Sequence, residues 1–191
     1  MNTWTNVSSA DFTFVYGGTT TSTAFGTRDG TNIVTFGEGL ESGTLAQNNV
    51  WYYTSTGYIS DSDVKFNTSN YTWGTTGSES VYDVQNIATH EFGHSLALDD
   101  LYNSADSEKT MYGYGSKGET KKISLDTDDI NGIAYLYPAS VPPSCTYTIS
   151  PTSATLSSSG NTGTVAVTTS SICFWTAVSN AGYPAEIGRL L

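Results

Sequence analysis

The chain has 191 residues, enough for one ordinary domain with its own buried core and a smaller second unit. Its formal net charge is -11, from 18 acidic against seven basic residues, so nucleic acid and anionic membrane surfaces are excluded as partners on electrostatic grounds. Only 13% of the residues are charged, a composition typical of secreted, loop-rich proteins that contain β-structure.

The N-terminus, MNTWTNVSSA, lacks the basic and apolar segments of a signal peptide. If the protein is exported, we expect the targeting segment to lie upstream. No apolar run approaches the roughly 20 residues that span a bilayer, so no membrane insertion is expected.

Short strands are predicted over residues 11–80, because alternating and compact apolar runs lie between turn-forming residues. The predicted strands are DFTFVY (11–16), NIVTF (32–36), NVWYYTSTGYI (49–59) and SDVKFN (62–67). RDGTN (28–32) and DSD (61–63) also offer the oxygen ligands that Ca²⁺ uses, although such residues commonly serve turn structure instead.

Two amphipathic helices follow. The first is predicted to begin near Asp83, a suitable N-cap, because apolar residues then recur at helical spacing to Leu96. The second is predicted over SLDTDDINGIAYLY (124–137), where Ser124, Asp126 or Thr127 could cap the start and Pro138 ends the helix.

The first helix contains the segment THEFGHSLALDD (89–100), with both histidines of the chain. His90 and His94 are four residues apart, so in a helix they lie about 40° apart on one face and can reach one zinc ion. Glu91 follows about 100° around the helix, where it can reach a water on that metal as general base. The same string also occurs by chance in proteins that bind no metal.

A catalytic zinc site needs a third protein ligand, and no third histidine exists. If the chain turns back after the helix, Asp99 or Asp100 can supply a carboxylate. The residues alone leave both open.

Composition changes at the Pro- and Ser-rich segment 139–144, which we interpret as a linker between units at 1–138 and 145–191. The second unit shows alternating β pattern and turns but is too short for a complete β-sandwich, so a partial one is predicted. Its Cys145 and Cys173 are the only cysteines, and one disulfide is their simplest use. A disulfide would fit an extracellular location.

HEFGHSLALDD resembles the extended zinc-binding motif of metzincin proteases, in the variant that ends in Asp, and its surroundings resemble the matrixin branch. The other matching segments are GTLAQ (43–47), DVKFN (63–67), YTWG (71–74), TMYGYG (110–115) and LDTDDINGIAYLY (125–137). The resemblance implies an α+β metzincin catalytic domain: a twisted mixed sheet, an active-site helix, a Met-turn and a C-terminal helix. Because the match begins near Trp4, the domain is expected to be truncated at its N-terminus.

The resemblance also implies roles for single residues. His90, His94 and Asp100 become zinc ligands, with Asp99 as the fallback, and Glu91 becomes the general base. Met111 becomes the packing residue of the Met-turn. Leu45 and Ala46 would bind a peptide as an added strand, with Tyr112 and Tyr114 bordering the specificity pocket, although ordinary sheet and loop roles remain the alternative.

Three departures from the family pattern stand out. Ala97 replaces the glycine that turns the chain after the helix. Gln47 replaces a histidine of an additional structural zinc, so no second zinc of that kind is expected. Gly113 and Gly115 replace the usual pocket wall, so a side-chain preference cannot be transferred.

Residues 145–180 resemble BACON-type immunoglobulin-like modules, which implies carbohydrate or surface attachment, or a spacer. Taken together, these features predict a secreted, zinc-dependent endopeptidase acting on extracellular proteins. The alternative is a non-catalytic secreted adhesion or binding protein, whose metal site has degenerated because Ala97 and the missing N-terminal elements impair it.

Overall fold

The computed structural model describes residues 1–75, 77–139, 145–155, 163–170, 173 and 175–177, which fall into two compact units, Met1–Ser140 and Val141–Leu191. In the described part of the first unit the helices are α1 (Asn2–Thr5), α2 (Val84–His94) and α3 (Thr127–Leu136), with short 3-10 turns at Ser104–Asp106 and Lys121–Ile123. None of the described helices is long and apolar enough to cross a membrane.

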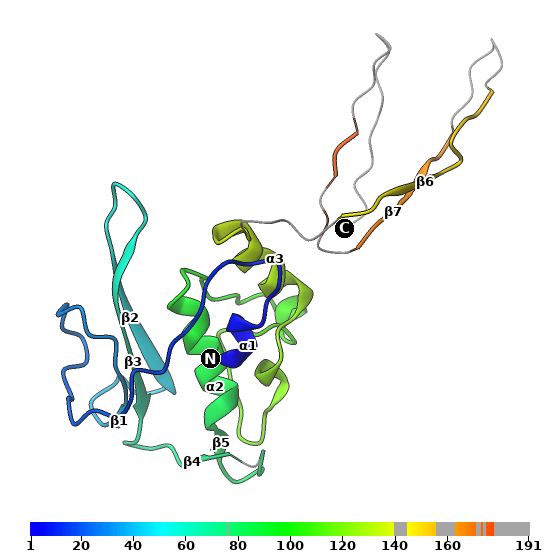
Figure 1. Ribbon diagram of the computed structural model, residues 1–191. Coiled ribbons are helices and arrows are strands. Elements are labelled where there is room, and N and C mark those ends of the chain that lie inside the picture. Colours follow the sequence, from blue (N-terminus) through cyan, green and yellow to red (C-terminus); the bar gives the residue numbers. More distant parts are fainter. Residues whose placement is uncertain (76, 140–144, 156–162, 171–172, 174, 178–191) are drawn as a thin grey trace. The chain divides into compact units, whose positions relative to one another are not determined.

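A mixed sheet lies beside α2 (Figure 1). Its strands are β1 (Val34–Gly37), β2 (Ala46–Tyr52) and β3 (Ile59–Asn67), in the order β1-β3-β2. β3 runs parallel to β1 and antiparallel to β2, which leaves β2 at the edge of this sheet. Two short parallel strands, β4 (Trp73–Gly74) and β5 (Tyr82–Asp83), lead into α2.

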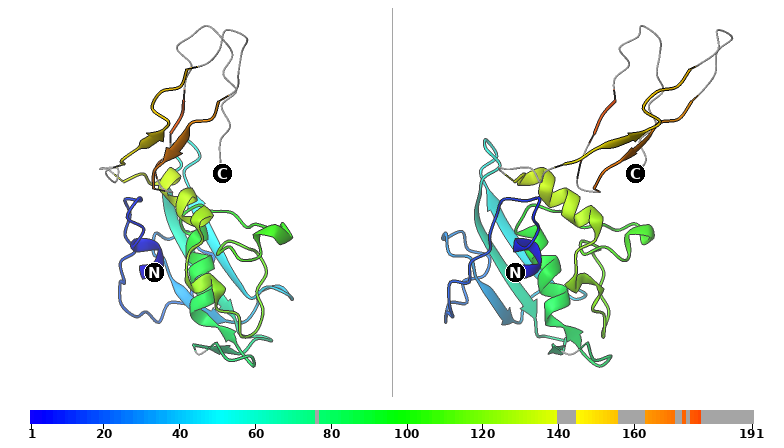
Figure 2. Two further views of the ribbon diagram at one scale, coloured as in Figure 1. Left: turned by 90° about the vertical axis from the view of Figure 1, so that its right-hand side faces the viewer. Right: turned by 45° about the vertical axis from the view of Figure 1, so that its right-hand side comes forward.

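Helix α2 packs against two apolar clusters, and its place beside the sheet can be followed in Figure 2. On one side Val64 and Phe66 of the sheet pack against Ile87. On the other side the buried residues come from α1, the turn after α2, the segment near residue 111 and α3, namely Trp4, Val7, Leu96, Met111 and Ile133. Because it is packed on both sides, α2 holds its side chains in fixed positions.

Both predicted helices are confirmed, including their start signals. Asp83 caps α2, where its side chain accepts a hydrogen bond from the backbone N–H of Asn86 at 2.9 Å. Of the three candidate caps for α3, Asp126 is the one used, and Asp129 completes a capping box. α3 ends at Leu136, before Pro138.

The predicted strand over 11–16 is wrong. Phe12 and Phe14 alternate because they pack on the helical cluster, while the backbone N–H of Phe14 donates to Thr5 Oγ1 instead of to a neighbouring strand. The predicted strand over 49–59 is interrupted, since β2 ends at Tyr52 and β3 starts at Ile59. The strands predicted over 32–36 and 62–67 overlap β1 and β3.

In the described part of the second unit, β6 (Thr148–Ser150) pairs antiparallel with β7 (Ala166–Thr168). Cys145 and Cys173 form the predicted disulfide, with 5.8 Å between their Cα atoms. One strand pair is too little to identify a β-sandwich, so that architecture stays a prediction, and most of the predicted linker lies outside the described residues.

Candidate active site

The two histidine side chains of α2 meet at their Nε2 atoms, which are 3.2 Å apart. The Nδ1 atom of His90 is 2.9 Å from the carbonyl oxygen of Thr110, and that of His94 is 2.8 Å from the carbonyl oxygen of Leu98. Because a carbonyl oxygen can only accept, each Nδ1 carries the proton, which leaves a lone pair on Nε2 of each neutral ring. Both lone pairs therefore face the same point.

Asp100 completes the cluster. Its Oδ1 atom lies 3.1 Å from Nε2 of His90 and 3.6 Å from Nε2 of His94. This oxygen is buried, and the two Nε2 atoms beside it can donate to it only when they are protonated. Asp99 also borders the pocket, but its side chain is exposed and lies outside the cluster. Of the two aspartates, Asp100 is therefore the one that lies beside the histidines.

The pKa values of His90 and Asp100 are shifted toward the charged form of each group. Burial lowers the pKa of His90, but the hydrogen bond to Asp100 and the charge of Glu91 outweigh it and raise the pKa overall. Burial raises the pKa of Asp100, yet hydrogen bonds from His90 and Tyr102 leave it lowered. In the metal-free protein both shifts favour the charged pair, whereas burial lowers the pKa of His94.

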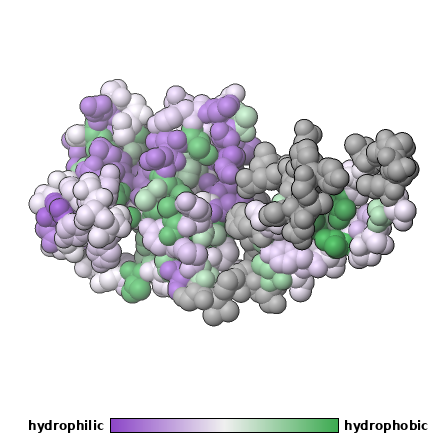
Figure 3. Space-filling view, turned by 90° about the horizontal axis from the view of Figure 1, so that it is seen from above, coloured by the Kyte–Doolittle hydropathy of each residue, from purple (hydrophilic) through white to green (hydrophobic). Residues whose placement is uncertain are grey.

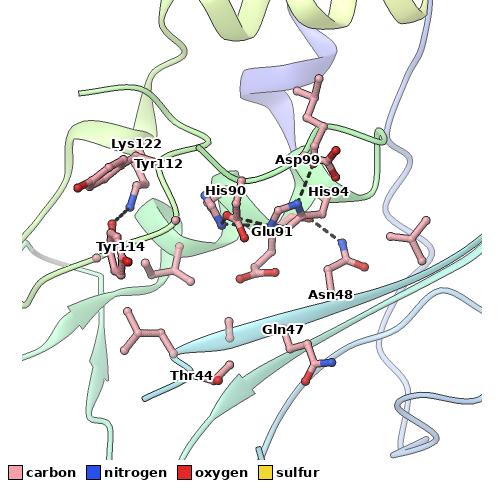
Figure 4. Close-up of a pocket in the computed structure, with 18 of the residues that line it drawn as sticks. Thr44, Gln47, Asn48, His90, Glu91, His94, Asp99, Tyr112, Tyr114 and Lys122 are labelled. Carbon is pink, nitrogen blue, oxygen red and sulfur yellow. Dashed lines mark hydrogen bonds and ion pairs between the residues drawn. The ribbon is translucent and has the colours of Figure 1, made fainter. Parts of the chain in front are cut away.

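Glu91 is only 4% exposed, and its Oε2 atom has no hydrogen-bond partner among the described residues. Burial raises the pKa of this carboxyl from 4.5 to about 7, opposed by the charges of His90 and Lys122. In Figure 4 the carboxyl group points into the pocket beside the two histidines. A carboxyl group that titrates near neutral pH and faces an open cleft is well suited to general acid–base chemistry.

The chain turns sharply after α2, at the position where glycine was expected. Ala97 has a φ of 66°, the one described non-glycine residue with positive φ. The backbone N–H of Leu98 then donates to the carbonyl of Gly93, a bond that helix ends of this kind make. The turn directs the Leu98 carbonyl to His94 and brings Asp100 back over the helix.

Ala97→Gly is expected to stabilise the protein by about 1 kcal/mol, because glycine adopts this left-handed conformation without the clash that a Cβ brings. Thermal unfolding of the metal-free protein should show a midpoint a few degrees higher. As a control, Ala134→Gly in the right-handed helix α3 should lower stability by about 1 kcal/mol. A lower midpoint for Ala97→Gly would contradict the strain argued here.

Met111 is buried beneath α2 and does not border the pocket. A Cβ placed on Gly93 would lie 2.2 Å from its sulfur, so this helix position has no room for a side chain. Asp129 accepts hydrogen bonds from the backbone N–H groups of Thr110 and Met111, at 3.0 and 3.4 Å. Helix α3 thereby holds the segment whose Thr110 carbonyl orients His90.

The cluster opens into a pocket of about 1000 Å³. One wall includes Leu45 and Ala46, where β2 begins, so all four predicted substrate-binding residues border the pocket. Another wall is the segment 112–115, whose Tyr112 and Tyr114 are labelled in Figure 4. Seen from above, the described surface shows hydrophobic residues as separate spots among hydrophilic ones (Figure 3).

Three residues near the site carry no sequence signal and were not predicted. Asn48 of β2 donates from Nδ2 to the Glu91 carbonyl at 2.6 Å and to Ser95 Oγ at 2.7 Å, which ties the edge strand to the end of α2. Lys122 is buried, donates to the Tyr114 carbonyl and lies 3.1 Å from Glu119, which fixes the pocket wall. Tyr102 donates to Asp100.

The aspartates proposed for calcium serve backbone groups. Asp61 Oδ2 accepts from the N–H groups of Asp29 and Gly30, both at 2.7 Å, and Asp63 accepts from Gly26 and Ile33. These bonds favour the turn-forming alternative, and calcium stays a prediction. Gln47 bonds to Asn49, and the expected lack of a second zinc is untested.

Two helix-borne imidazoles, a carboxylate from the following turn and a buried glutamate at an open cleft are typical of zinc-dependent hydrolases. The comparisons with known proteins narrow this class. Residues 1–138 match the family model described as Matrixin, so the chain belongs to the matrixin family of metalloendopeptidases, and the predicted resemblance is confirmed for these residues. The resemblance of residues 145–180 to a BACON-type module found no support.

The curated relatives match over shorter segments. Matrix metalloproteinase-18 of Xenopus laevis is 42% identical over 66 residues, 35% of this chain and 13% of the relative. Metalloendoproteinase 2-MMP of Arabidopsis thaliana is 40% identical over 73 residues, 38% of this chain and 18% of the relative. Neutrophil collagenase of Homo sapiens is 41% identical over 66 residues, 35% of this chain and 13% of the relative. The chain thus spans under a fifth of each. No solved structure matched.

Proposed function

We propose that the chain is a zinc-dependent endopeptidase in which His90, His94 and Asp100 hold the metal and Glu91 is the general base. The observation that carries this proposal is the convergence of two Nε2 lone pairs and a buried carboxylate oxygen on one point. Three acceptors so close repel one another unless they share a cation.

The spacing of the three atoms fits zinc. Ligands about 2.0–2.1 Å from a tetrahedral zinc lie roughly 3.3–3.4 Å from one another. The observed separations are 3.1, 3.2 and 3.6 Å. These three residues would hold the metal and would leave it accessible from the pocket, as a catalytic rather than a structural zinc requires.

When bound, zinc supplies Lewis-acid activation of a water molecule and of the scissile carbonyl. Glu91 would accept the proton of the attacking water at its free Oε2 atom and later donate it to the leaving amine. In the metal-free structure burial raises the pKa of this carboxyl to about 7, and a group that both accepts and donates a proton works best with a pKa near the working pH. The pocket walls would keep the peptide in place during both steps.

The edge strand β2 supports a peptide substrate. The side of β2 that does not pair with β3 borders the pocket, so a peptide could bind there by main-chain hydrogen bonds as an added strand, with Leu45 and Ala46 in contact. Tyr112 and Tyr114 would border the side-chain pocket. We infer that the substrates are extracellular proteins, in keeping with the disulfide.

The alternative of a non-catalytic binding protein rests on the missing N-terminal elements and on a turn impaired by Ala97, and the structure bears on the second ground. Ala97 does adopt the left-handed conformation, and Asp100 still reaches both histidines, which favours the enzyme. Carbohydrate or surface attachment through residues 145–191 remains a separate prediction.

We expect the purified protein to cleave a mixed peptide library, to lose this activity with a zinc chelator and to regain it when zinc is restored. The physical reason is that the three proposed ligand atoms lie within 4.8 Å of one another, so that one metal ion could bind all three. Mass spectrometry of the products, with a chelator-treated sample as control, provides the measurement. Cleavage unaffected by chelation would contradict a zinc mechanism.

A further inference from the structure

We propose that Tyr102 is a positioning residue that holds the Asp100 carboxylate in its metal-binding orientation. This inference rests on the proposed zinc site. The two carboxylate oxygens of Asp100 make different contacts. Oδ1 faces the histidines, whereas Oδ2 accepts a hydrogen bond from the Tyr102 hydroxyl at 2.9 Å. Second contacts of this kind orient metal ligands and raise metal affinity.

The backbone explains why the two side chains meet. Leu101 forms a parallel bridge with Tyr112: its N–H donates to the Met111 carbonyl at 2.8 Å, and its carbonyl accepts from Gly113 N–H at 2.9 Å. In an extended segment, alternate residues point to the same side. Asp100 and Tyr102 therefore flank Leu101 on one face, where the phenol can reach the carboxylate.

Gly113 leaves the space that this contact occupies. A Cβ on Gly113 would lie 2.5 Å from Cε1 of Tyr102 and 3.2 Å from Oδ1 of Asp100. Gly113, which replaces a residue of the family's usual pocket wall, therefore leaves room for the contact between Tyr102 and Asp100. It gives a reason for a glycine here that is independent of substrate preference.

The hydrogen bond compensates for the weak attachment of Asp100. The ligand lies on a turn with a left-handed alanine, and its side chain is 29% exposed, so packing alone does not fix the carboxylate. The hydroxyl removes rotational freedom of the carboxylate before metal binds. Its loss should weaken zinc binding without changing the fold, because the Tyr102 side chain is itself 61% exposed.

The test is zinc affinity, measured by competition with a chromogenic chelator, in Tyr102→Phe and in Tyr114→Phe as a matched control. Tyr114 is also 61% exposed and its ring contacts Tyr102 edge-to-face at 5.6 Å. We expect the zinc dissociation constant to rise about tenfold in Tyr102→Phe and to stay unchanged in Tyr114→Phe. The unfolding midpoint of metal-free Tyr102→Phe should equal that of the wild type.

Comparison with Tyr102→Ala separates the effect of the hydroxyl from that of the ring. Most of the zinc affinity that Tyr102→Ala loses should already be lost in Tyr102→Phe. A zinc affinity equal to the wild type in Tyr102→Phe would overturn the inference. So would a lower unfolding midpoint of the metal-free variant that accounts for its lost zinc affinity. Failure of the wild type to bind zinc would instead overturn the proposed function.

Discussion

Replacing Glu91 with glutamine is expected to remove peptide hydrolysis while zinc binding is retained. Glutamine keeps the shape of the side chain but cannot accept a proton, and general-base catalysis contributes a factor of about 10² to 10⁴. The ligand atoms belong to other residues, so zinc content should stay at one per chain. Peptide turnover and metal analysis of the same sample measure both effects. Hydrolysis at the wild-type rate would remove Glu91 from the mechanism.

The same variant should change the pH dependence of stability in the presence of a chelator. The buried Glu91 releases its proton near pH 7 in the folded protein and near 4.5 when unfolded, so the wild type loses stability as pH rises between these values. Between these two pH values the free energy of unfolding of the wild type should fall by on the order of 3 kcal/mol. Denaturant unfolding should therefore show Glu91→Gln more stable than wild type at pH 8 and nearly equal at pH 4. Parallel curves would contradict the burial argument.

Replacing Asp100 with alanine is expected to weaken zinc binding more than about 100-fold, since removing a direct ligand should exceed the 10–100-fold effect of removing its supporting contact. Two imidazoles would remain, and the chain has no third histidine to replace the carboxylate. Competition with a chelator of known affinity measures the change.

Asp99→Ala is the matched control, because it removes the neighbouring carboxylate, which is exposed and outside the cluster. Its zinc affinity should equal that of the wild type. The reverse pattern, with zinc lost in Asp99→Ala and kept in Asp100→Ala, would transfer the role of third ligand to Asp99.

Local features were predictable from the sequence. The cap of α2 at Asp83 was predicted, and Asp126 of α3 was one of three candidates, because such caps depend on side chains that bond to N–H groups two or three residues away. The meeting of His90 and His94 likewise follows from helix geometry alone.

Features set by tertiary contacts were not predictable. The alternation of Phe12 and Phe14 indicated a strand, yet both rings pack on helices. Asp99 and Asp100 could not be distinguished from spacing, because the choice depends on the backbone conformation of Ala97. Tyr102 was missed because it reaches Asp100 only when its segment pairs with residues 111–113.

We propose that one zinc ion is held by His90, His94 and Asp100. An anomalous difference map from crystals, recorded on both sides of the zinc absorption edge, tests it most directly. We predict a single strong peak about 2.0–2.2 Å from the two Nε2 atoms and from Oδ1 of Asp100. A zinc-supplemented crystal with no peak there, or with its peak on other residues, would contradict the account.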